Sequence, residues 1–327
     1  MDLSTTYLGL KLGTPLIVGA SPFADDVYAA RQLQDAGAGA IVMRSLFEEQ
    51  IYLDALSPGT AKHLHPSDEP GAFPLPWEYQ LNPDKYLKQI TDLKSALSIP
   101  VIASLNGCSP GGWIDFARRF EAAGADAIEL NLYHLSTDPF VSALEVENEL
   151  LETVKLIKAT TKVPIAVKLQ PFYTALAHFS KELEKAGADG LVIFTSLYQS
   201  DISVDEQERV AKLRLSDPTE LLVRLRWLSA LSPHLRCSLG LTGGVHSGDA
   251  VIKGLLAGAH AVQLVSVVLK HGPHILTAIA HDLRRWMEDH RYHCLADFRG
   301  SLSTPSSQDS PSAERADYQR LLQMWQM

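Results

Sequence analysis

Short apolar runs of strand length alternate with amphipathic stretches of helical length along most of the chain. Four of these runs follow the tripeptide Ala-Gly-Ala, which occurs at residues 36–38, 123–125, 186–188 and 257–259. A glycine just past a helix commonly ends it, because glycine enters the left-handed region without strain. Each tripeptide therefore predicts a helix end that leads into a buried strand. These four strands are expected at residues 40–45, 127–132, 191–195 and 261–266.

A second set of four apolar runs lies between the members of the first set, and each begins at or near a proline. These runs are residues 14–20, 99–105, 163–168 and 233–239. Proline is tolerated at the first residue of a strand but not in its middle, so it marks strand starts here. Interleaving the two sets gives a repeated strand–helix unit. Parallel strands that alternate with helices in this way predict an α/β fold, a (βα)8 TIM barrel.

The length of 327 residues and a hydrophobic content of 46% suit one large domain with a full core. We predict one barrel domain over residues 1–300, in which residues 1–13 form a hairpin that closes one barrel end. Two insertions, near residues 47–82 and 197–217, are long enough to be lids or binding loops. Residues 301–327 form a Ser/Pro-rich tail with a short terminal helix.

Composition narrows the classes of partner. A net charge of −9 argues against nucleic acid, whose phosphates would be repelled. The three cysteines, Cys108, Cys237 and Cys294, are too far apart in sequence to indicate a disulfide framework or a metal cluster. No secretory signal and no apolar run of membrane-spanning length is present. We therefore expect a cytoplasmic protein that neither associates with a membrane nor binds a metal ion.

In a (βα)8 barrel the active site lies at the carboxyl ends of the strands. Lys168 ends an otherwise apolar strand, and its ammonium requires a partner or the barrel mouth, because an unpaired buried charge is costly. The Gly243-Gly244 turn offers backbone N–H groups where such barrels often hold phosphate. A simple ion pair and a plain tight turn remain the alternatives. The candidate site residues at strand ends are Ala20, Ser21, Arg44, Ser45, Asn106, Asn131, His134, Lys168, Thr195, Gly243, Gly244 and Ser266.

Several short motifs occur together in a characteristic order. They are Ala20-Ser21, Arg44-Ser45, Glu129-Leu130-Asn131-Leu132, Val167-Lys168-Leu169, Thr242-Gly243-Gly244-Val245, Leu269-Lys270-His271-Gly272-Pro273 and Leu295-Ala296-Asp297-Phe298-Arg299-Gly300. Through these motifs the chain resembles the dihydroorotate dehydrogenase family, in particular its soluble FMN-dependent class, over residues 3–300. The resemblance implies oxidation of dihydroorotate to orotate, a step of pyrimidine biosynthesis, with hydride transfer to flavin N5.

The resemblance also implies roles for individual residues. Lys168 would stabilise the negative charge of reduced flavin near N1 and O2, and Gly243, Gly244 and Ser266 would hold the phosphate. Arg44 would bind flavin or a substrate carboxylate. The cofactor-binding residues implied are Ala20, Ser21, Arg44, Ser45, Asn131, Lys168, Thr195, Gly243, Gly244, Val265 and Ser266. The substrate-binding residues implied are Arg44, Asn106, Ser136, Thr195 and Ser196.

The sequence departs from the family pattern at the substrate side. His134 stands where the family has a Cys or Ser base, and an imidazole can serve as proton acceptor, so His134 and Lys168 are the predicted catalytic residues. Phe73–Gln80 replaces the family's substrate-binding loop, and Thr195 replaces an asparagine that pairs with the pyrimidine. Val265-Ser266 replaces a Gly-Thr pair and would crowd the phosphate.

These departures leave alternatives open. One is a flavoprotein that acts on a different substrate. Another is a non-flavin phosphate-binding barrel, a lyase or isomerase that uses Lys168 as a Schiff-base amine. A third is a catalytically silent flavin-binding or partner-binding protein. The resemblance further leaves open a homodimer and a separate electron-transfer partner beside the small-molecule substrate.

Overall fold

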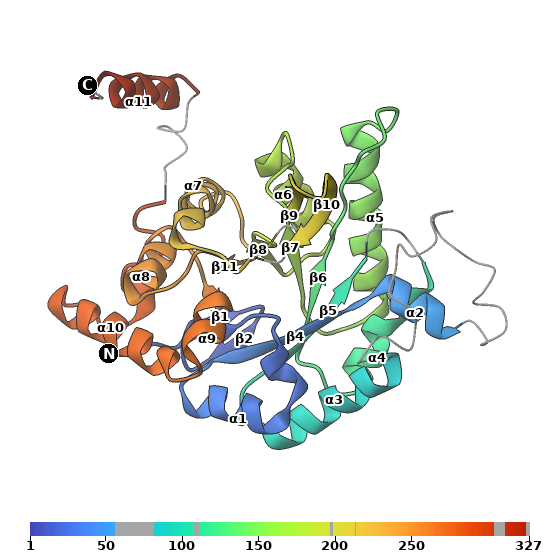
Figure 1. The fold of residues 1–327 in the computed structure, drawn as a ribbon. Coiled ribbons are helices and arrows are strands. Elements are labelled where there is room, and N and C mark those ends of the chain that lie inside the picture. Colours follow the sequence, from blue (N-terminus) through green and yellow to red (C-terminus); the bar gives the residue numbers. More distant parts are fainter. Residues whose placement is uncertain (56–81, 108–110, 197–198, 213, 304–310, 325–327) are drawn as a thin grey trace.

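Parallel strands close into a barrel at the centre of the molecule (Figure 1). The computed structural model describes residues 1–55, 82–107, 111–196, 199–212, 214–303 and 311–324. The strand order around the barrel is β11-β12-β3-β4-β5-β6-β7-β8, and every neighbouring pair is parallel. The predicted (βα)8 fold is therefore confirmed. The barrel strands are β3 (Leu16–Val18), β4 (Ala40–Phe47), β5 (Val101–Asn106), β6 (Ala127–Asn131), β7 (Ile165–Leu169), β8 (Gly190–Ile193), β11 (Ser238–Thr242) and β12 (Ala261–Leu264).

Helices surround the barrel and follow its strands in chain order (Figure 1). They are α1 (Val27–Asp35), α2 (Glu48–Ala55), α3 (Pro83–Ala96), α4 (Phe116–Ala122), α5 (Ala143–Thr160), α6 (Leu176–Lys185), α7 (Leu221–Leu231), α8 (Gly248–Leu256), α9 (Ser266–His271) and α10 (Ile275–Asp289). Short 3₁₀ helices lie at η1 (Pro22–Asp25), η3 (Gly112–Asp115), η4 (Pro218–Glu220) and η5 (Leu295–Asp297). No helix within the described residues is long and apolar enough to cross a membrane.

The Ala-Gly-Ala tripeptides end helices as predicted. After α1, the Gly37 amide donates to the carbonyl of Gln34 and the Ala38 amide donates to that of Leu33. This pair of bonds satisfies carbonyls that the last helical turn leaves open, and it requires a left-handed residue between them. The glycine of each tripeptide has that conformation, with φ of 101° at Gly37, 98° at Gly124, 106° at Gly187 and 111° at Gly258.

An N-terminal hairpin fills the amino end of the barrel, as the sequence predicted. Its strands β1 (Thr5–Tyr7) and β2 (Leu10–Leu12) are antiparallel, and Tyr7, Leu8 and Leu12 pack against inward-facing barrel residues. Half of those residues are alanines, which leave room for the hairpin. At Gly190 a Cβ would lie 2.5 Å from the Leu8 side chain, so β8 can carry only glycine there without displacing the hairpin.

The insertions take forms that the sequence did not predict. Within residues 197–217 the chain forms an antiparallel pair, β9 (Gln199–Ser203) and β10 (Glu208–Lys212). Within residues 47–82, α2 follows β4 directly, whereas 56–81, including Phe73–Gln80, lie outside the described residues, as does Cys108. The tail contains helix α11 (Pro311–Met324).

Candidate active site at the barrel mouth

Polar side chains occupy the barrel interior above the layer that contacts the hairpin. Alternate residues of a strand face the same side of the sheet, so Glu129 of β6 points inward two positions beyond Ala127. Ala127, Ala166 and Ala261 belong to the cluster around the hairpin. The next inward positions along the same three strands are Glu129, Lys168 and Gln263. A small apolar layer therefore supports a polar layer nearer the mouth.

The polar layer contains a buried ion pair. The Lys168 ammonium lies 3.0 Å from a Glu129 carboxylate oxygen and donates to the Gln263 side-chain oxygen at 3.3 Å. The Gln263 amide donates in turn to the other oxygen of Glu129. Only 1% of Glu129, 8% of Lys168 and 1% of Gln263 is exposed to solvent. The two charged groups and the amide therefore stabilise one another in place of water.

Sequence reasoning identified Lys168 but missed Glu129 and Gln263. The signal that could have found them is the same alternation, because each is a polar residue at an inward position of an otherwise apolar strand. Their mutual contact was not predictable from spacing, since β12 lies opposite β6 only once the barrel has closed.

Two polar atoms at the strand ends are buried without a hydrogen-bond partner among the described residues. They are the side-chain oxygen Oδ1 of Asn131 and the hydroxyl Oγ of Ser21. Asn131 is in register with Lys168 on one side and with Asn106 on the other, so β5, β6 and β7 present these three side chains together. Buried unpaired polar atoms are rare in folded proteins, and a bound polar ligand is a common reason for them.

A β-bulge in β4 shapes the neighbouring part of the mouth. The register of β4 with β5 shifts between Val42 and Ser45. The Tyr86 hydroxyl of α3 enters the ladder there, accepting from the Ser104 amide at 2.9 Å and donating to the Ser104 carbonyl at 3.2 Å. The Ser45 and Ser104 hydroxyls are hydrogen-bonded at 2.8 Å. The bulge thus aims Ser45 at the polar layer.

The bulge also sets the direction of Arg44. Its guanidinium forms a two-point ion pair with Asp25 of η1, at 3.1 Å from Nε and 2.5 Å from Nη2. Burial raises the pKa of the Asp25 carboxyl, and the adjacent Arg44 charge opposes that rise. The Arg44 side chain remains partly exposed, so a role in ligand binding stays a prediction.

The Gly243-Gly244 turn forms a second part of the site, at the end of β11. Both glycines have positive φ, 88° and 73°. A Cβ on Gly243 would lie 2.5 Å from Arg224 Nε, and one on Gly244 would lie 2.5 Å from the Leu221 amide nitrogen. The turn is therefore restricted to glycine both by conformation and by space.

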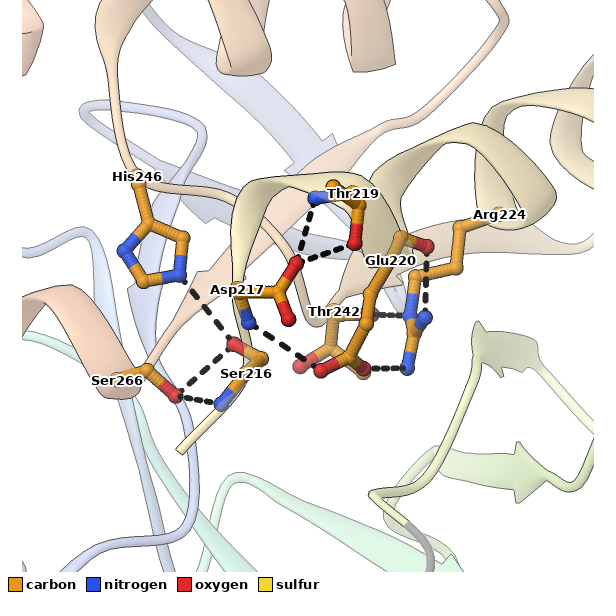
Figure 2. Close-up of polar contacts among 8 residues, drawn as sticks. All are labelled: Ser216, Asp217, Thr219, Glu220, Arg224, Thr242, His246 and Ser266. Carbon is orange, nitrogen blue, oxygen red and sulfur yellow. Dashed lines mark hydrogen bonds and ion pairs between the residues drawn. The ribbon is translucent and has the colours of Figure 1, made fainter. Parts of the chain in front are cut away.

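Arg224 of α7 contacts Thr242, the residue directly before this turn (Figure 2). Its Nε donates to the Thr242 carbonyl at 2.6 Å, and its Nη1 donates to the Glu220 carbonyl at 2.7 Å. Its Nη2 lies 3.1 Å from the Glu220 carboxylate. Burial lowers the pKa of the Arg224 guanidinium, and the Glu220 carboxylate opposes that change. Arg224 has no sequence signal of its own, because its role depends on α7 packing beside β11.

The β12 end completes this region. Val265 lies beside the residue that follows β3, since a Cβ on Gly19 would lie 2.7 Å from a Val265 methyl group. The next residue, Ser266, accepts hydrogen bonds from the Ser216 amide at 3.0 Å and the Ser216 hydroxyl at 2.9 Å (Figure 2). Val265 therefore faces the neighbouring strand end, while Ser266 faces the segment after β10.

The remaining predicted residues lie beyond the strand ends. Thr195 is buried after β8, and its amide donates to the Leu169 carbonyl at 2.8 Å. Ser196 and Ser136 are exposed, and Ala20 and His134 are half-buried. Among the described residues, no hydrogen bond joins His134 to Lys168 or Asn131. The structure thus brings the strand-end residues together but leaves His134, Ser136 and Ser196 in the surrounding loops.

Comparisons with known proteins point to one family. A family model for dihydroorotate dehydrogenase matches residues 80–287. The chain is 28% identical over 317 residues (91% of this chain, 97% of the relative) to an Aeropyrum pernix protein provisionally named dihydroorotate dehydrogenase A (fumarate). It is 26% identical over 308 residues (91% and 98%) to a Thermoplasma volcanium protein named dihydroorotate dehydrogenase B (NAD(+)), catalytic subunit. A Methanocella arvoryzae protein with that second name is 29% identical over 279 residues (82% and 87%).

Proposed function

This chain belongs to the dihydroorotate dehydrogenase family, and we propose that it is an FMN-dependent oxidoreductase acting on a CH–CH bond, with dihydroorotate as the first substrate to test. The observation that carries this proposal is the polar layer at the mouth. There a buried, ion-paired Lys168 lies in register with Asn131, whose side-chain oxygen has no partner among the described residues.

The described residues fit FMN at both ends of the site. Lys168 would supply a cation to stabilise the negative charge of reduced flavin, and Asn131 and Ser21 have buried polar atoms without a partner among the described residues that would contact the cofactor. Gly243 and Gly244 form a cradle that a Cβ would fill, which suits close approach of a phosphate to backbone N–H groups. Ala20, Arg44, Ser45, Thr195, Val265 and Ser266 complete the proposed cofactor contacts.

The protein's own groups would orient substrate and move one proton. Bound FMN would supply the two-electron acceptor that oxidation of a CH–CH bond requires. The imidazole of His134 would take the proton from the carbon next to the one that loses hydride. Arg44, Asn106, Ser136, Thr195 and Ser196 would bind the substrate's polar groups. Glu129 and Gln263 would keep Lys168 pointing into the mouth.

The ion pair argues against the Schiff-base alternative. Imine formation requires a free amine at the lysine. The Lys168 nitrogen instead contacts the side-chain oxygens of Glu129 and Gln263, and imine formation would break both contacts. A flavoprotein with a different substrate is the better second candidate, because His134 is half-buried in a loop and has no hydrogen-bond partner among the described residues.

The electron acceptor and the assembly are further proposals. Relatives named catalytic subunits of the NAD(+) form suggest that this chain also passes electrons to a separate partner subunit. A homodimer and a cytoplasmic location are also proposed, on the resemblance to the family's soluble class alone.

The visible absorption spectrum of the purified protein tests the cofactor, and anaerobic addition of dihydroorotate tests the substrate. A flavin band that bleaches supports both parts, and His134→Ala should then slow bleaching without removing the band. A flavin band that persists retains the FMN proposal and rejects dihydroorotate. A colourless protein that takes up no added FMN rejects the proposed function.

A further inference from the structure

Two residues outside the family motifs lie beside the proposed phosphate site. Ser216 precedes η4, and His246 follows the Gly243-Gly244 turn (Figure 2). Ser216 contacts both Ser266 and His246, so segments after β10, β11 and β12 converge on it. Neither Ser216 nor His246 has a part in the proposed oxidation.

The directions of the hydrogen bonds in this group are informative. Ser266 Oγ accepts from the amide of Ser216 at 3.0 Å and from its hydroxyl at 2.9 Å. The single hydroxyl hydrogen of Ser216 is used in this way, so His246 is the donor in the 3.5 Å contact of its Nε2 with Ser216 Oγ in the tautomer that carries a hydrogen on Nε2. The sequence of donors therefore runs from His246 through Ser216 to Ser266.

This sequence of donors ends on a hydroxyl without an acceptor. Ser266 is 9% exposed, and among the described residues nothing accepts its hydroxyl hydrogen. A buried donor of this kind is costly when unpaired. An anionic oxygen beside the Gly243-Gly244 turn would supply the acceptor, and it would meet a donor already polarised by two others.

The charged groups around His246 are largely committed to other partners. Asp217 accepts from the Thr219 amide at 2.8 Å and from its hydroxyl, and these bonds lower the Asp217 pKa. Glu220 accepts from the Asp217 amide at 3.2 Å and pairs with Arg224. Arg214 also lies near Asp217.

Burial and the nearby Lys270 lower the pKa of His246, against the opposing effects of Ser216, Asp217 and Glu220. A bound phosphate dianion would favour the imidazolium by attraction of opposite charges. The folded protein without ligand therefore disfavours the charged form, and the ligand would restore it. Binding should then take up a proton as the pH falls toward and below neutrality.

We propose that Ser216 and His246 belong to this protein's phosphate site, as a relay of donors through which Ser266 binds the phosphate monoester of the cofactor. The inference rests on the proposed function for the identity of that ester. In addition, His246 makes phosphate binding depend on pH, and Ser216 makes the segment after β10 part of the cofactor site.

The test compares FMN with riboflavin, which lacks the phosphate. The full-length protein is freed of flavin, and both affinities are measured by fluorescence quenching at pH 6 and pH 8. His246→Gln retains a donor but removes the titratable charge, and Ser216→Ala breaks the relay. His271→Gln, an exposed histidine at the end of α9, is the matched control. The phosphate titrates near pH 6 itself, but that effect is common to all variants and cancels in the comparison.

We expect Ser216→Ala to weaken FMN binding by roughly tenfold at both pH values, from the loss of a hydrogen bond to a charged group. His246→Gln should weaken it by roughly five- to tenfold at pH 6 and by less than about twofold at pH 8. Riboflavin affinity and the control should be unchanged. Equal FMN affinity in all variants, or equal losses for FMN and riboflavin, overturns the inference.

A second experiment distinguishes failure of this inference from failure of the proposed function. Inorganic phosphate is added to the flavin-free protein, and Tm is measured in the wild type and in Ser216→Ala. If neither flavin binds but phosphate raises Tm in the wild type alone, the phosphate site stands and the FMN proposal fails. If FMN binds and bleaches normally in every variant, the FMN proposal stands and the relay fails.

Discussion

The ion pair between Glu129 and Lys168 offers a quantitative test of how the barrel interior is stabilised. The perturbation is a double-mutant cycle of Glu129→Gln, Lys168→Met and the two combined. Both replacements preserve approximate volume, so packing changes little. The side chains are 2% and 10% exposed, and solvent therefore screens the pair very weakly.

The expected energies follow from the contacts. Lys168→Met leaves the Glu129 carboxylate with only the Gln263 amide, and Glu129→Gln leaves a buried ammonium opposite two neutral oxygens. Removing one partner of a buried pair costs about 3–5 kcal/mol, whereas replacing both partners is often nearly neutral. We therefore expect each single variant to lose about 3 kcal/mol and the double variant to lose about 3–4 kcal/mol instead of the sum of about 6 kcal/mol, because the Gln that replaces Glu129 stays polar; this is a coupling energy of about 2–3 kcal/mol.

The assay is urea unfolding of the flavin-free protein at pH 7, followed by circular dichroism and tryptophan fluorescence so that coincident transitions validate the analysis. Lys155→Met is the matched control, because its ion pair with Glu152 is more than half exposed and should contribute less than about 1 kcal/mol. If the energies of the single variants sum to that of the double variant within about 0.5 kcal/mol, the two charges are not coupled and the reasoning fails.

Two further predictions concern the turn and the acid stability. Gly244→Ala should lose about 1–3 kcal/mol of stability and most FMN affinity, since a Cβ at this position would clash with the Leu221 amide nitrogen. Gly9→Ala is the control, because Gly9 has a similar φ of 75° and nothing within 4 Å of its added Cβ, so that it measures the cost of backbone conformation alone. Equal losses in Tm for the two variants would contradict the steric argument. Burial, with a smaller effect of Arg299, lowers the pKa of His260 to about 4, and its Nδ1 accepts from the Leu239 amide at 3.0 Å. The unfolded imidazole takes its proton first, near pH 6.5, so this contribution of up to about 3 kcal/mol is present above pH 6.5 and is lost as the pH falls toward 4. Urea unfolding at pH 7, 5.5 and 4.5 should show a shallower loss in His260→Asn, which keeps an acceptor; an unchanged slope would show that His260 is not responsible.

The candidate site was predictable in part. Lys168 was identifiable because a charged residue ends an apolar strand, and Gly243-Gly244 because two glycines follow a strand before a helix. His134 and Ser136 were identified by their place in a motif. Their distance from the polar layer depends on the conformation of a long loop, and motif position does not determine that conformation.

The sequence by itself determined the barrel, because its signals are local. Each strand is marked by its own apolar run, and four helix ends are marked by a glycine in the left-handed conformation. The repeat of these units then leaves few ways to close the sheet. The barrel can therefore be predicted without knowing which distant residues contact each other.

Only the tertiary structure decided which polar groups meet. Glu129 and Gln263 are 134 residues apart in sequence, and they touch because the closed barrel sets β12 opposite β6. Tyr86 enters the β4–β5 ladder only where a bulge opens it, and Ser216 reaches Ser266 only because the segment after β10 returns to the barrel. Burial makes each of these contacts obligatory, since a polar group removed from water must find its partner wherever the fold has placed one.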